Sequence, residues 1–228
     1  MVDKIITVDG PSGVGKGTLA AFLSLNLGWK LLDSGAIYRA AALYLKSNDL
    51  SVNDEESILK LKKMPIKFVI KEGKSVCLLG GEDVSSEIRT EESGIMASRI
   101  AVLADVRSAL LECQKSFNDG KGLIADGRDM GSVVFPNAPL KLYLSASAES
   151  RANRRYKELK HKGLDADYNE VLKNIIERDH RDQTRKASPL KPAKDAVIVD
   201  TSDLTIQQVQ GVALAEIKKI KKVLKTCC

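Results

Sequence analysis

The sequence predicts an α/β protein in which a parallel sheet is flanked by helices. Strand-like apolar runs alternate with helical ones along most of the 228 residues, as expected when helices connect parallel strands. The first apolar run leads directly into a glycine-rich turn and a helix, the order found in phosphate-binding loops. Only residues 65–90 depart from this alternation, and their pattern indicates antiparallel strands.

The elements of the core are expected in a regular order. Parallel strands are expected at residues 5–9, 29–33, 122–126, 140–144 and 196–200. Helices are expected at residues 19–27, 37–46, 95–117 and 204–224. A further helix is expected between Asn53 and Pro65, because Asn53 with Glu56 three residues later forms an N-cap pattern.

Two segments stand apart from this core. Residues 66–70 and 76–79 alternate as strands around a turn at 71–74, which predicts a hairpin. We expect a small inserted subdomain at about residues 65–90, over the carboxyl edge of the sheet, although a surface flap would show the same pattern. Residues 149–194 are polar and helical, which indicates a lid. Both belong to a single domain over residues 1–228.

The last helix is expected to pack against the sheet through one apolar face. Its lysines recur on the opposite face, which should contact water. The residues predicted to form the apolar face are Val209, Val212, Ala213, Ile217, Ile220 and Leu224.

Composition and charge limit the function. The 36 Lys and Arg against 30 Asp and Glu give a net charge of +6, but aromatic residues make up only 4%. A nucleic-acid-binding protein would be expected to interleave basic and aromatic residues, so anionic small molecules explain the charge better. No segment resembles a secretory signal or a membrane span, which favours a cytoplasmic protein with no membrane contact.

The cysteines and histidines indicate neither a metal site nor a disulfide framework. Their spacing matches no metal-binding pattern, and a reducing compartment fits four cysteines in a chain of this size. The terminal Cys227-Cys228 pair carries no complete lipidation signature, so we expect it to be an exposed chain end.

The glycine-rich turn is the most informative motif. It carries the pattern G-x-x-x-x-G-K, in which backbone N–H groups and a helix N-terminus favour a bound anion. Lys16 can reach the outer phosphates of a nucleotide. An ordinary glycine-rich turn would not be expected to come with the strand, the helix and the lysine together. The predicted nucleotide-binding residues are Gly10, Pro11, Ser12, Gly13, Val14, Gly15, Lys16, Gly17 and Thr18.

One position in this loop bears on the metal. Gly17 stands where many such loops have the Ser or Thr that binds magnesium, with Thr18 after it. We therefore expect Mg²⁺ to be held more by water and phosphate than by protein ligands, and we assign no metal-binding residue. Asp9, Asp33 and Asp126 end predicted strands, where each alone could simply form a turn. Together they indicate carboxylates that orient metal-bound water, with Asp126 foremost.

A second constellation follows the third predicted strand. Arg128 and Asp129 stand side by side in a glycine-flanked loop that can approach a ligand closely. The guanidinium could bind phosphate, and the carboxylate could accept a hydrogen bond from an exocyclic amine. An ion pair between these two neighbours is the simpler alternative.

The lid contributes a third group of charges. Arg178, Arg181, Asp182 and Arg185 fall at helical spacing on one face, with further arginines at residues 151–155. A charged helix face is usually only solvated. Because guanidinium groups match phosphoryl oxygens, we expect these arginines to reach the transferring group when the lid closes, and to contribute little to folding.

Four motifs together resemble the bacterial cytidylate kinases, which are nucleoside monophosphate kinases of the P-loop superfamily. They are G-P-S-G-V-G-K-G-T at residues 10–18, D-S-G-A-I-Y-R at 33–39, I-A-D-G-R-D-M-G-S-V-V-F-P at 124–136 and R-D-x-R-D-x-x-R at 178–185. The phosphate loop alone occurs in many families, but the four in this order are specific. The likeness spans nearly the whole chain.

The resemblance implies transfer of the γ-phosphoryl group of ATP, with Mg²⁺, to CMP or dCMP by a monomer. It also implies a five-stranded parallel core, a monophosphate-binding insertion and a lid. The residues it assigns to the acceptor phosphate are Ser34, Arg39, Arg128 and Arg185. Those it assigns to the base are Ser98, Arg107 and Asp129, and those for the ribose are Arg178 and Asp182. The expected catalytic residues are Lys16, Arg128, Arg178 and Arg185.

Three other functions remain open at this stage. A nucleotide switch should carry a guanine-reading motif such as N-K-x-D, and the sequence contains none. A nucleic-acid-binding protein should bind polynucleotide with a steep dependence on salt. Within the enzymes, adenylate kinase or another small-molecule kinase is the alternative.

Overall fold

The computed structural model describes residues 4–225, and side chains as far as residue 220 except Glu91. The predictions for the first residues of the chain, for the side chain of Leu224 and for the Cys227-Cys228 pair lie outside this part. Within it, no helix is both long and apolar enough to cross a bilayer.

Five parallel strands form the central sheet. They lie in the order β2-β6-β1-β7-β8. Their bounds are β1 Ile5–Asp9, β2 Lys30–Asp33, β6 Leu123–Gly127, β7 Leu140–Ser145 and β8 Val197–Asp200. All four pairings are parallel, so every strand ends at the same edge and the loops that follow gather there. The fold class and the five strands predicted from the sequence are confirmed, with ends within one residue.

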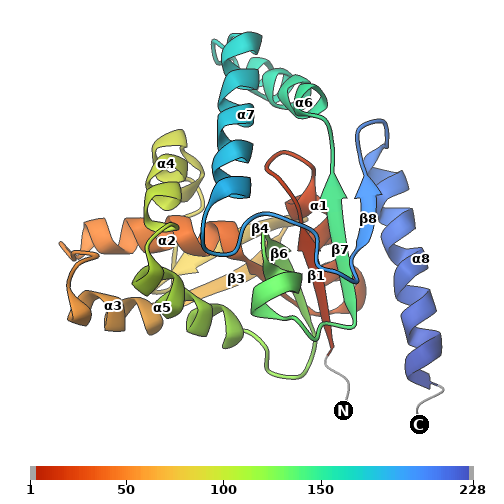
Figure 1. Cartoon of the computed structure of the whole chain (residues 1–228), viewed down its shortest axis with the longest axis horizontal. Helices are drawn as coiled ribbons and strands as arrows, with labels where there is room; N and C mark the ends of the chain where they lie inside the picture. The colour runs from red at the N-terminus through yellow and green to blue at the C-terminus, as the bar shows by residue number, and fades with distance from the viewer. Residues whose placement is uncertain (1–3, 226–228) are drawn as a thin grey trace.

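Helices cover both faces of this sheet (Figure 1). On one face, α1 (Lys16–Leu27) and α8 (Ile206–Lys225) pack over the apolar side chains of alternate residues in β1 and β6. On the other face, α2 (Ser34–Ser47) and α5 (Ala104–Lys115) bury the intervening residues. This two-sided burial explains why the strands are apolar without alternation.

Three sequence predictions about helices were wrong in detail. The N-cap of α3 (Glu55–Lys62) is Asp54 rather than Asn53, because its carboxylate accepts a hydrogen bond from the backbone N–H of Ser57 at 2.9 Å. The helix expected at 95–117 is two helices, α4 (Glu91–Ile100) and α5. Val212 is 36% exposed, because it lies at the edge of the apolar stripe of α8.

A separate three-stranded sheet forms the insertion. It consists of β3 (Ile66–Lys71), β4 (Lys74–Leu79) and β5 (Glu82–Asp83), all antiparallel. Glu72 and Gly73 both have positive φ, as a two-residue hairpin turn requires. A short 3₁₀ helix, η1 (Glu87–Arg89), connects this sheet to α4. That this insertion binds the monophosphate stays a prediction.

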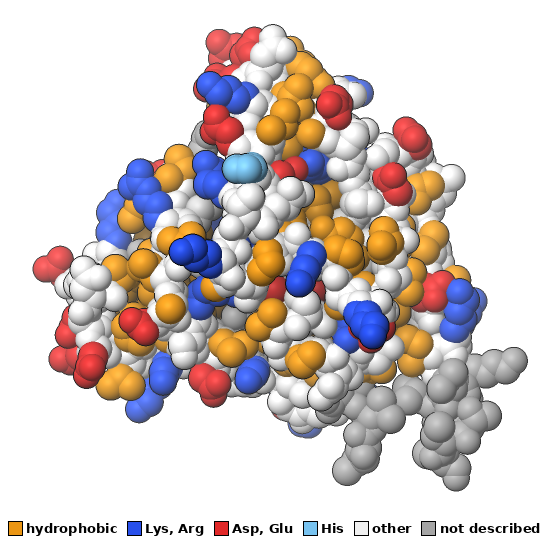
Figure 2. All heavy atoms as spheres, viewed as in Figure 1, with side chains coloured by type: hydrophobic (Ala, Val, Ile, Leu, Met, Phe, Trp, Pro, Cys, Tyr) orange, Lys and Arg blue, Asp and Glu red, His pale blue; other side chains and the backbone are white. Residues whose placement is uncertain are grey.

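The segment predicted to be a lid forms a helical hairpin, α6 (Ala148–His161) and α7 (Tyr168–Thr184). The two helices pack against each other beyond the carboxyl end of β7, and α7 stands opposite α4 (Figure 1). Basic and acidic side chains are interspersed over the face shown in Figure 2, rather than gathered into one basic stripe. The carboxyl edge of the sheet is thus flanked by the insertion, by α4 and by the helical hairpin.

Candidate functional site

The phosphate loop is fixed between β1 and α1 by glycine geometry. Gly10 has a φ of +145°, and a Cβ atom there would lie 2.2 Å from the carbonyl oxygen of Leu144 in β7. Only glycine permits this close approach of loop and strand. Gly15, the residue before α1, has a φ of +92°, and no side chain caps the helix there. The N-terminal N–H groups of α1 therefore remain directed at the loop, where they favour an anion.

Lys16 lies in this loop with its ammonium group buried. Its Nζ donates a hydrogen bond to the carbonyl oxygen of Pro11 at 2.7 Å. Burial and, next, the nearby positive charges of Arg128 and Arg178 together lower the pKa of Lys16 to about 7, against the opposing effect of the Asp126 carboxylate. A bound phosphate would supply the negative charge that this ammonium group needs.

A cavity of about 240 Å³ opens at the phosphate loop. Ser12, Gly13 and Lys16 form its floor, while residues of the insertion and of α7 form its walls. The insertion contributes Ser75, Cys77, Ser85, Ile88 and Arg89. The phosphate loop, the insertion and α7 therefore all contribute to the lining of this cavity.

The three strand-end carboxylates have different roles. Asp9 accepts hydrogen bonds from the backbone N–H groups of Met130 and Gly131, at 2.9 and 2.7 Å, so it fixes the turn after β6. Asp33 lines the cavity, but one of its oxygens caps α2. The expectation that all three converge on a metal site was therefore wrong for Asp9, whose carboxylate is occupied by the backbone.

Asp126 is the carboxylate that faces the loop. A Cβ atom on Gly17 would lie 3.6 Å from its Oδ2, so a longer side chain at position 17 would point toward this group. Asp126 is buried, and desolvation raises its pKa to about 7 despite the positive charge of Lys16. Within residues 4–225, no group of three or more acidic, Cys or His side chains could hold a metal ion. The described chain thus offers no larger group of ligands at the loop, and Asp126 is the carboxylate that faces it, with Asp33 in the same cavity.

A second cavity, of about 320 Å³, adjoins the first. The structure brings nine of the predicted site residues to its lining, from α2, α4, α5, the turn after β6 and α7. They are Ser34, Arg39, Ser98, Arg107, Arg128, Asp129, Arg178, Asp182 and Arg185. Their individual binding roles stay predictions.

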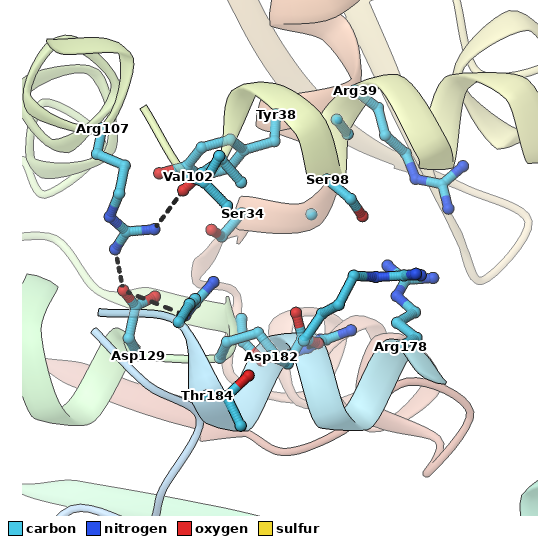
Figure 3. Close-up of a pocket in the computed structure, with 17 residues that line it drawn as sticks. Ser34, Tyr38, Arg39, Ser98, Val102, Arg107, Asp129, Arg178, Asp182 and Thr184 are labelled. Atoms are coloured by element: carbon cyan, nitrogen blue, oxygen red, sulfur yellow. Dashed lines mark hydrogen bonds and ion pairs between the residues drawn. The ribbon is translucent and has the colours of Figure 1, made fainter. Parts of the chain in front are cut away.

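One end of this cavity is built around Asp129 (Figure 3). Its Oδ2 accepts a hydrogen bond from Arg107 at 2.6 Å and lies 3.8 Å from Arg185 Nη2. The Ser98 hydroxyl donates to the carbonyl oxygen of Gly94 at 3.0 Å. This end therefore offers a carboxylate and a guanidinium, and the Ser98 hydroxyl lines the same cavity; together they form a set that can read the polar edge of a base.

The other end is formed by arginines, and it continues into the phosphate-loop cavity. Arg39, Arg128 and Arg178 line both cavities (Figure 3 labels Arg39 and Arg178). Burial and the nearby positive charge of Arg128 together lower the pKa of Arg178 to about 10. The buried Nε of Arg178 has no hydrogen-bond partner within the described chain. Since buried donors are normally paired, an anion is the ligand expected at this junction.

Arg128 and Asp129 do not pair with each other. Arg128 Nε donates to Asp182 Oδ2 at 2.9 Å, whereas Asp129 pairs with Arg107. The simple ion pair considered from the sequence is therefore wrong. The two neighbours point to opposite ends of the cavity, one to the arginine cluster and one to the base-reading end.

The arginines of α6 are held by the protein rather than directed at the cavities. Arg151 is 3% exposed, pairs with Asp179 of α7 at 2.5 Å and donates to the Ser12 carbonyl at 3.2 Å. Arg154 donates to the carbonyl oxygens of Thr201 and Ser202. Arg155 forms a surface pair with Glu158. None of the three lines either cavity, and their approach to the transferring group on lid closure stays a prediction.

Arg185 also differs from its prediction as part of an exposed helix face. It follows the last turn of α7 in an extended conformation, and its Nε donates to the Ser188 carbonyl at 2.6 Å. Its side chain is 11% exposed, so it is largely buried. The four motif residues share one cavity because the chain turns at Arg185, not because a single helix presents them all.

Sequence reasoning missed two kinds of cavity residue. Tyr38 lies within the D-S-G-A-I-Y-R motif and lines the second cavity beside Val102 (Figure 3). Burial raises the pKa of its phenol. The insertion residues Ser75, Ser85 and Arg89 carried no sequence signal, because only the folded hairpin places them opposite the phosphate loop.

A phosphate loop, a helical hairpin beside it and an arginine-lined second cavity define a P-loop kinase. A model of the cytidylate kinase family matches residues 6–219. The chain is 50% identical to "Cytidylate kinase" of Haemophilus ducreyi, over 97% of this chain and all of that one. It is 51% identical to that of Actinobacillus succinogenes, over 94% and 98%. The chain belongs to the cytidylate kinase family.

Among solved structures, a shikimate kinase from Bacteroides thetaiotaomicron aligns with 96% of this chain and 98% of its own, at 13% identity and a TM-score of 0.48.

Proposed function

We propose that this protein transfers the γ-phosphoryl group of ATP to CMP and dCMP, giving CDP or dCDP and ADP. The observation that carries the proposal is the junction of the two cavities, where Arg39, Arg128 and Arg178 line both. A phosphate loop on one side suits the donor triphosphate, and a base-reading end on the other suits the acceptor. Family membership supports the same donor and acceptor.

The transfer needs positioning and charge neutralisation more than a proton acceptor. An oxygen of the acceptor phosphate attacks the γ-phosphorus of ATP, while the bond from that phosphorus to the β–γ bridging oxygen breaks and ADP leaves. The attacking oxygen is already largely anionic near neutral pH. Lys16 and the shared arginines neutralise the charge on the transferring group, and they bring two anions together that would otherwise repel each other.

We infer that the Asp129 end selects cytosine. Cytosine presents an amino donor beside two acceptors, so Asp129 and the Ser98 hydroxyl would accept from the amine while Arg107 donates to N3 and O2. Uracil has a carbonyl oxygen in place of the amine, which would face the carboxylate. Arg178 and Asp182 line the same cavity and are assigned to the ribose.

We propose Mg²⁺ as the metal cofactor. A carboxylate beside the phosphate loop fits this ion, which is usually held by one or two carboxylates together with substrate phosphates and water. Asp126 would hold it, mainly through water, since Gly17 supplies no hydroxyl. When bound, Mg²⁺ supplies neutralisation of the phosphate charges.

We also propose a cytoplasmic monomer. The two cysteines whose surroundings are described, Cys77 and Cys113, are free and buried, which fits a reducing compartment. The monomeric state is what the resemblance described above implies. Light scattering after size-exclusion chromatography would measure the mass.

A panel of monophosphates tests the function. ADP formation from ATP and Mg²⁺ is measured with CMP, dCMP, UMP, AMP and GMP as acceptors. CMP and dCMP are expected to be the preferred acceptors by kcat/KM. A preference for AMP would point to an adenylate kinase and overturn the proposal, and so would an absence of ADP formation with every acceptor.

A further inference from the structure

The side of the phosphate-loop cavity opposite the loop carries an arginine that the phosphate-loop and lid motifs do not explain. Arg89 is the last residue of η1, where the insertion leads into α4, and it lines the cavity together with Ser75 and Ser85. Its side chain is exposed, so a ligand in the cavity can reach it. Lys16, Arg39, Arg128 and Arg178 also line the cavity. Arg89 is therefore the fifth cation in the lining, and it comes from the insertion side.

Two contacts fix the position of Arg89. Its Nη2 donates to the Ser75 carbonyl oxygen of β4 at 2.5 Å, which holds the side chain along the hairpin. Arg39 Nη1 donates to the carbonyl oxygens of Ile88 and Thr90, at 2.7 and 3.0 Å, which holds the backbone on both sides of Arg89. The bond to Ser75 uses one of the five N–H donors of a guanidinium, so others can contact a ligand.

A purely structural role explains this arrangement poorly. Many side chains could donate one hydrogen bond to the exposed carbonyl oxygen of Ser75. That bond does not require a positive charge beside the four other cations of the cavity. Arg89 even lowers the pKa of Arg39, after burial and the other nearby arginines, so its charge adds to the repulsion within the cluster. Cations gathered at such a cost are expected where an anion of high charge binds, and the triphosphate of ATP is such an anion.

We propose that Arg89 is a further phosphate-binding residue, contributed by the insertion, which contacts the phosphates of the donor nucleotide in the phosphate-loop cavity. This inference rests on the proposed function, in which that cavity holds ATP. The insertion then acts on both substrates, because the segment that carries Arg89 is bonded to Arg39 of the acceptor cavity.

The test compares Arg89→Gln and Arg89→Lys with Arg99→Gln as the matched control. Arg99 is an exposed arginine of α4 that lines neither cavity. Steady-state kinetics with varied ATP at saturating CMP are measured for each variant, with thermal unfolding as the check on folding. Binding of inorganic tripolyphosphate is measured by calorimetry as a probe that carries no base or ribose.

Arg89→Gln is expected to lower kcat/KM for ATP and to weaken tripolyphosphate binding, each by about tenfold or more, as for a lost charged hydrogen bond. Arg89→Lys is expected to recover part of both, because it restores the charge but not the planar fork. Equal behaviour of Arg89→Gln and Arg99→Gln would overturn the inference. If Arg89→Gln does not fold, wild-type values for both quantities in Arg89→Lys would overturn it.

The two proposals fail in different ways. If the wild-type protein phosphorylates CMP but the Arg89 variants match the control, only the role of Arg89 is overturned. If the wild-type protein does not phosphorylate CMP, the proposed function fails, and tripolyphosphate binding still decides whether Arg89 contacts phosphate.

Discussion

Asp129 has a different task from its neighbour Arg128, although the two residues are adjacent in the chain. Asp129 is buried at the base-reading end, 2.6 Å from Arg107, whereas Arg128 lies in the arginine cluster. Adjacent side chains thus point to different ends of one cavity, and we propose that they contact different ends of one substrate. Their substitutions should therefore affect activity in different ways.

We predict that Asp129→Ala lowers the use of CMP and narrows the ratio of CMP to UMP activity by about tenfold or more, because the preference for an amine over a carbonyl disappears. Arg128→Ala is the matched comparison and should lower activity with both acceptors alike, through their common phosphate. Both ratios come from kcat/KM with CMP and UMP. An unchanged ratio in Asp129→Ala would contradict the assignment of this carboxylate to the base.

Lys16 gives a prediction about protons. Its pKa is about 7 in the ligand-free protein against an ordinary value of 10.5, so at pH 8 most molecules carry a neutral amine. Triphosphate anions raise that pKa on binding, and ATP binding at pH 8 should therefore take up a proton. For the same reason, the affinity for ATP should fall as the pH rises above about 7.

Calorimetry of ATP binding in two buffers of different ionisation enthalpy measures this uptake. Asp126 also has a pKa raised to about 7, and a nearby anion would raise it further, so the measurement is repeated with Asp126→Asn, in which this carboxylate cannot contribute. Proton release at pH 8, or no exchange at all, would contradict a neutral Lys16 in the free protein.

At the scale of elements, the helical hairpin is tied to the phosphate loop by a buried ion pair. Arg151 of α6 pairs with Asp179 of α7 and donates to the Ser12 carbonyl. The Cβ of Arg151 would also lie 3.4 Å from a Cβ placed on Gly13. The base of this hairpin is therefore anchored to the loop, although α7 itself has no fully buried residue.

We predict that Asp179→Ala destabilises the protein by about 3 kcal/mol, because Arg151 would be left buried without its carboxylate. Glu158→Gln is the control: Glu158 pairs with Arg155 and Lys162 on the surface at 48% exposure, and its loss should cost less than about 1 kcal/mol. Urea denaturation gives both values. A loss below about 1 kcal/mol for Asp179→Ala would show that the hairpin is not anchored by this pair.

The elements that the sequence predicted well are those with strong local patterns. The five parallel strands are apolar on both faces, and the phosphate loop is set by its glycines, so each was predicted within one residue. The N-cap at Asp54 and the break between α4 and α5 depend on which of several neighbouring residues completes a hydrogen bond, and pattern alone does not decide that.

Long-range pairing explains why part of the site could not be predicted. Asp129 with Arg107, Arg128 with Asp182 and Arg151 with Asp179 join residues 22, 54 and 28 positions apart, and nothing local distinguishes these partners from others. The resemblance supplied the residues of the acceptor cavity. It did not indicate that Asp9 fixes a turn, or that the insertion forms a wall of the phosphate-loop cavity.

At the scale of the whole molecule, the two cavities described above meet at one group of arginines and are flanked by three units of the chain. A ligand that fills both cavities should therefore hold the insertion, the sheet edge and the helical hairpin together. A ligand that fills only one cavity would not contact the residues that line the other cavity, and those residues would remain free to move. The difference should appear in thermal stability.

We predict that a bisubstrate analogue, with adenosine and cytidine joined through five phosphates, raises the melting temperature more than ATP and CMP analogues do separately at equal saturation. At a hundred times its Kd, a ligand stabilises the native state by about 2.7 kcal/mol, so the concentrations must be matched to each Kd. Scanning fluorimetry with Mg²⁺ measures the shifts. Equal shifts for the bisubstrate analogue and for either half would contradict a junction that belongs to both substrates.

Two of the three arginines at this junction, Arg39 and Arg128, already have internal partners in the ligand-free protein. Arg128 is bonded to the Asp182 carboxylate, and Arg39 to the carbonyl oxygens of Ile88 and Thr90. A dianionic acceptor phosphate can compete for these guanidinium groups, but a water molecule in the same place carries no charge with which to displace them. We therefore expect water to be a poor replacement for the acceptor phosphate as the group that attacks ATP. This ligand-free arrangement should accordingly disfavour hydrolysis of ATP by water when no acceptor is bound.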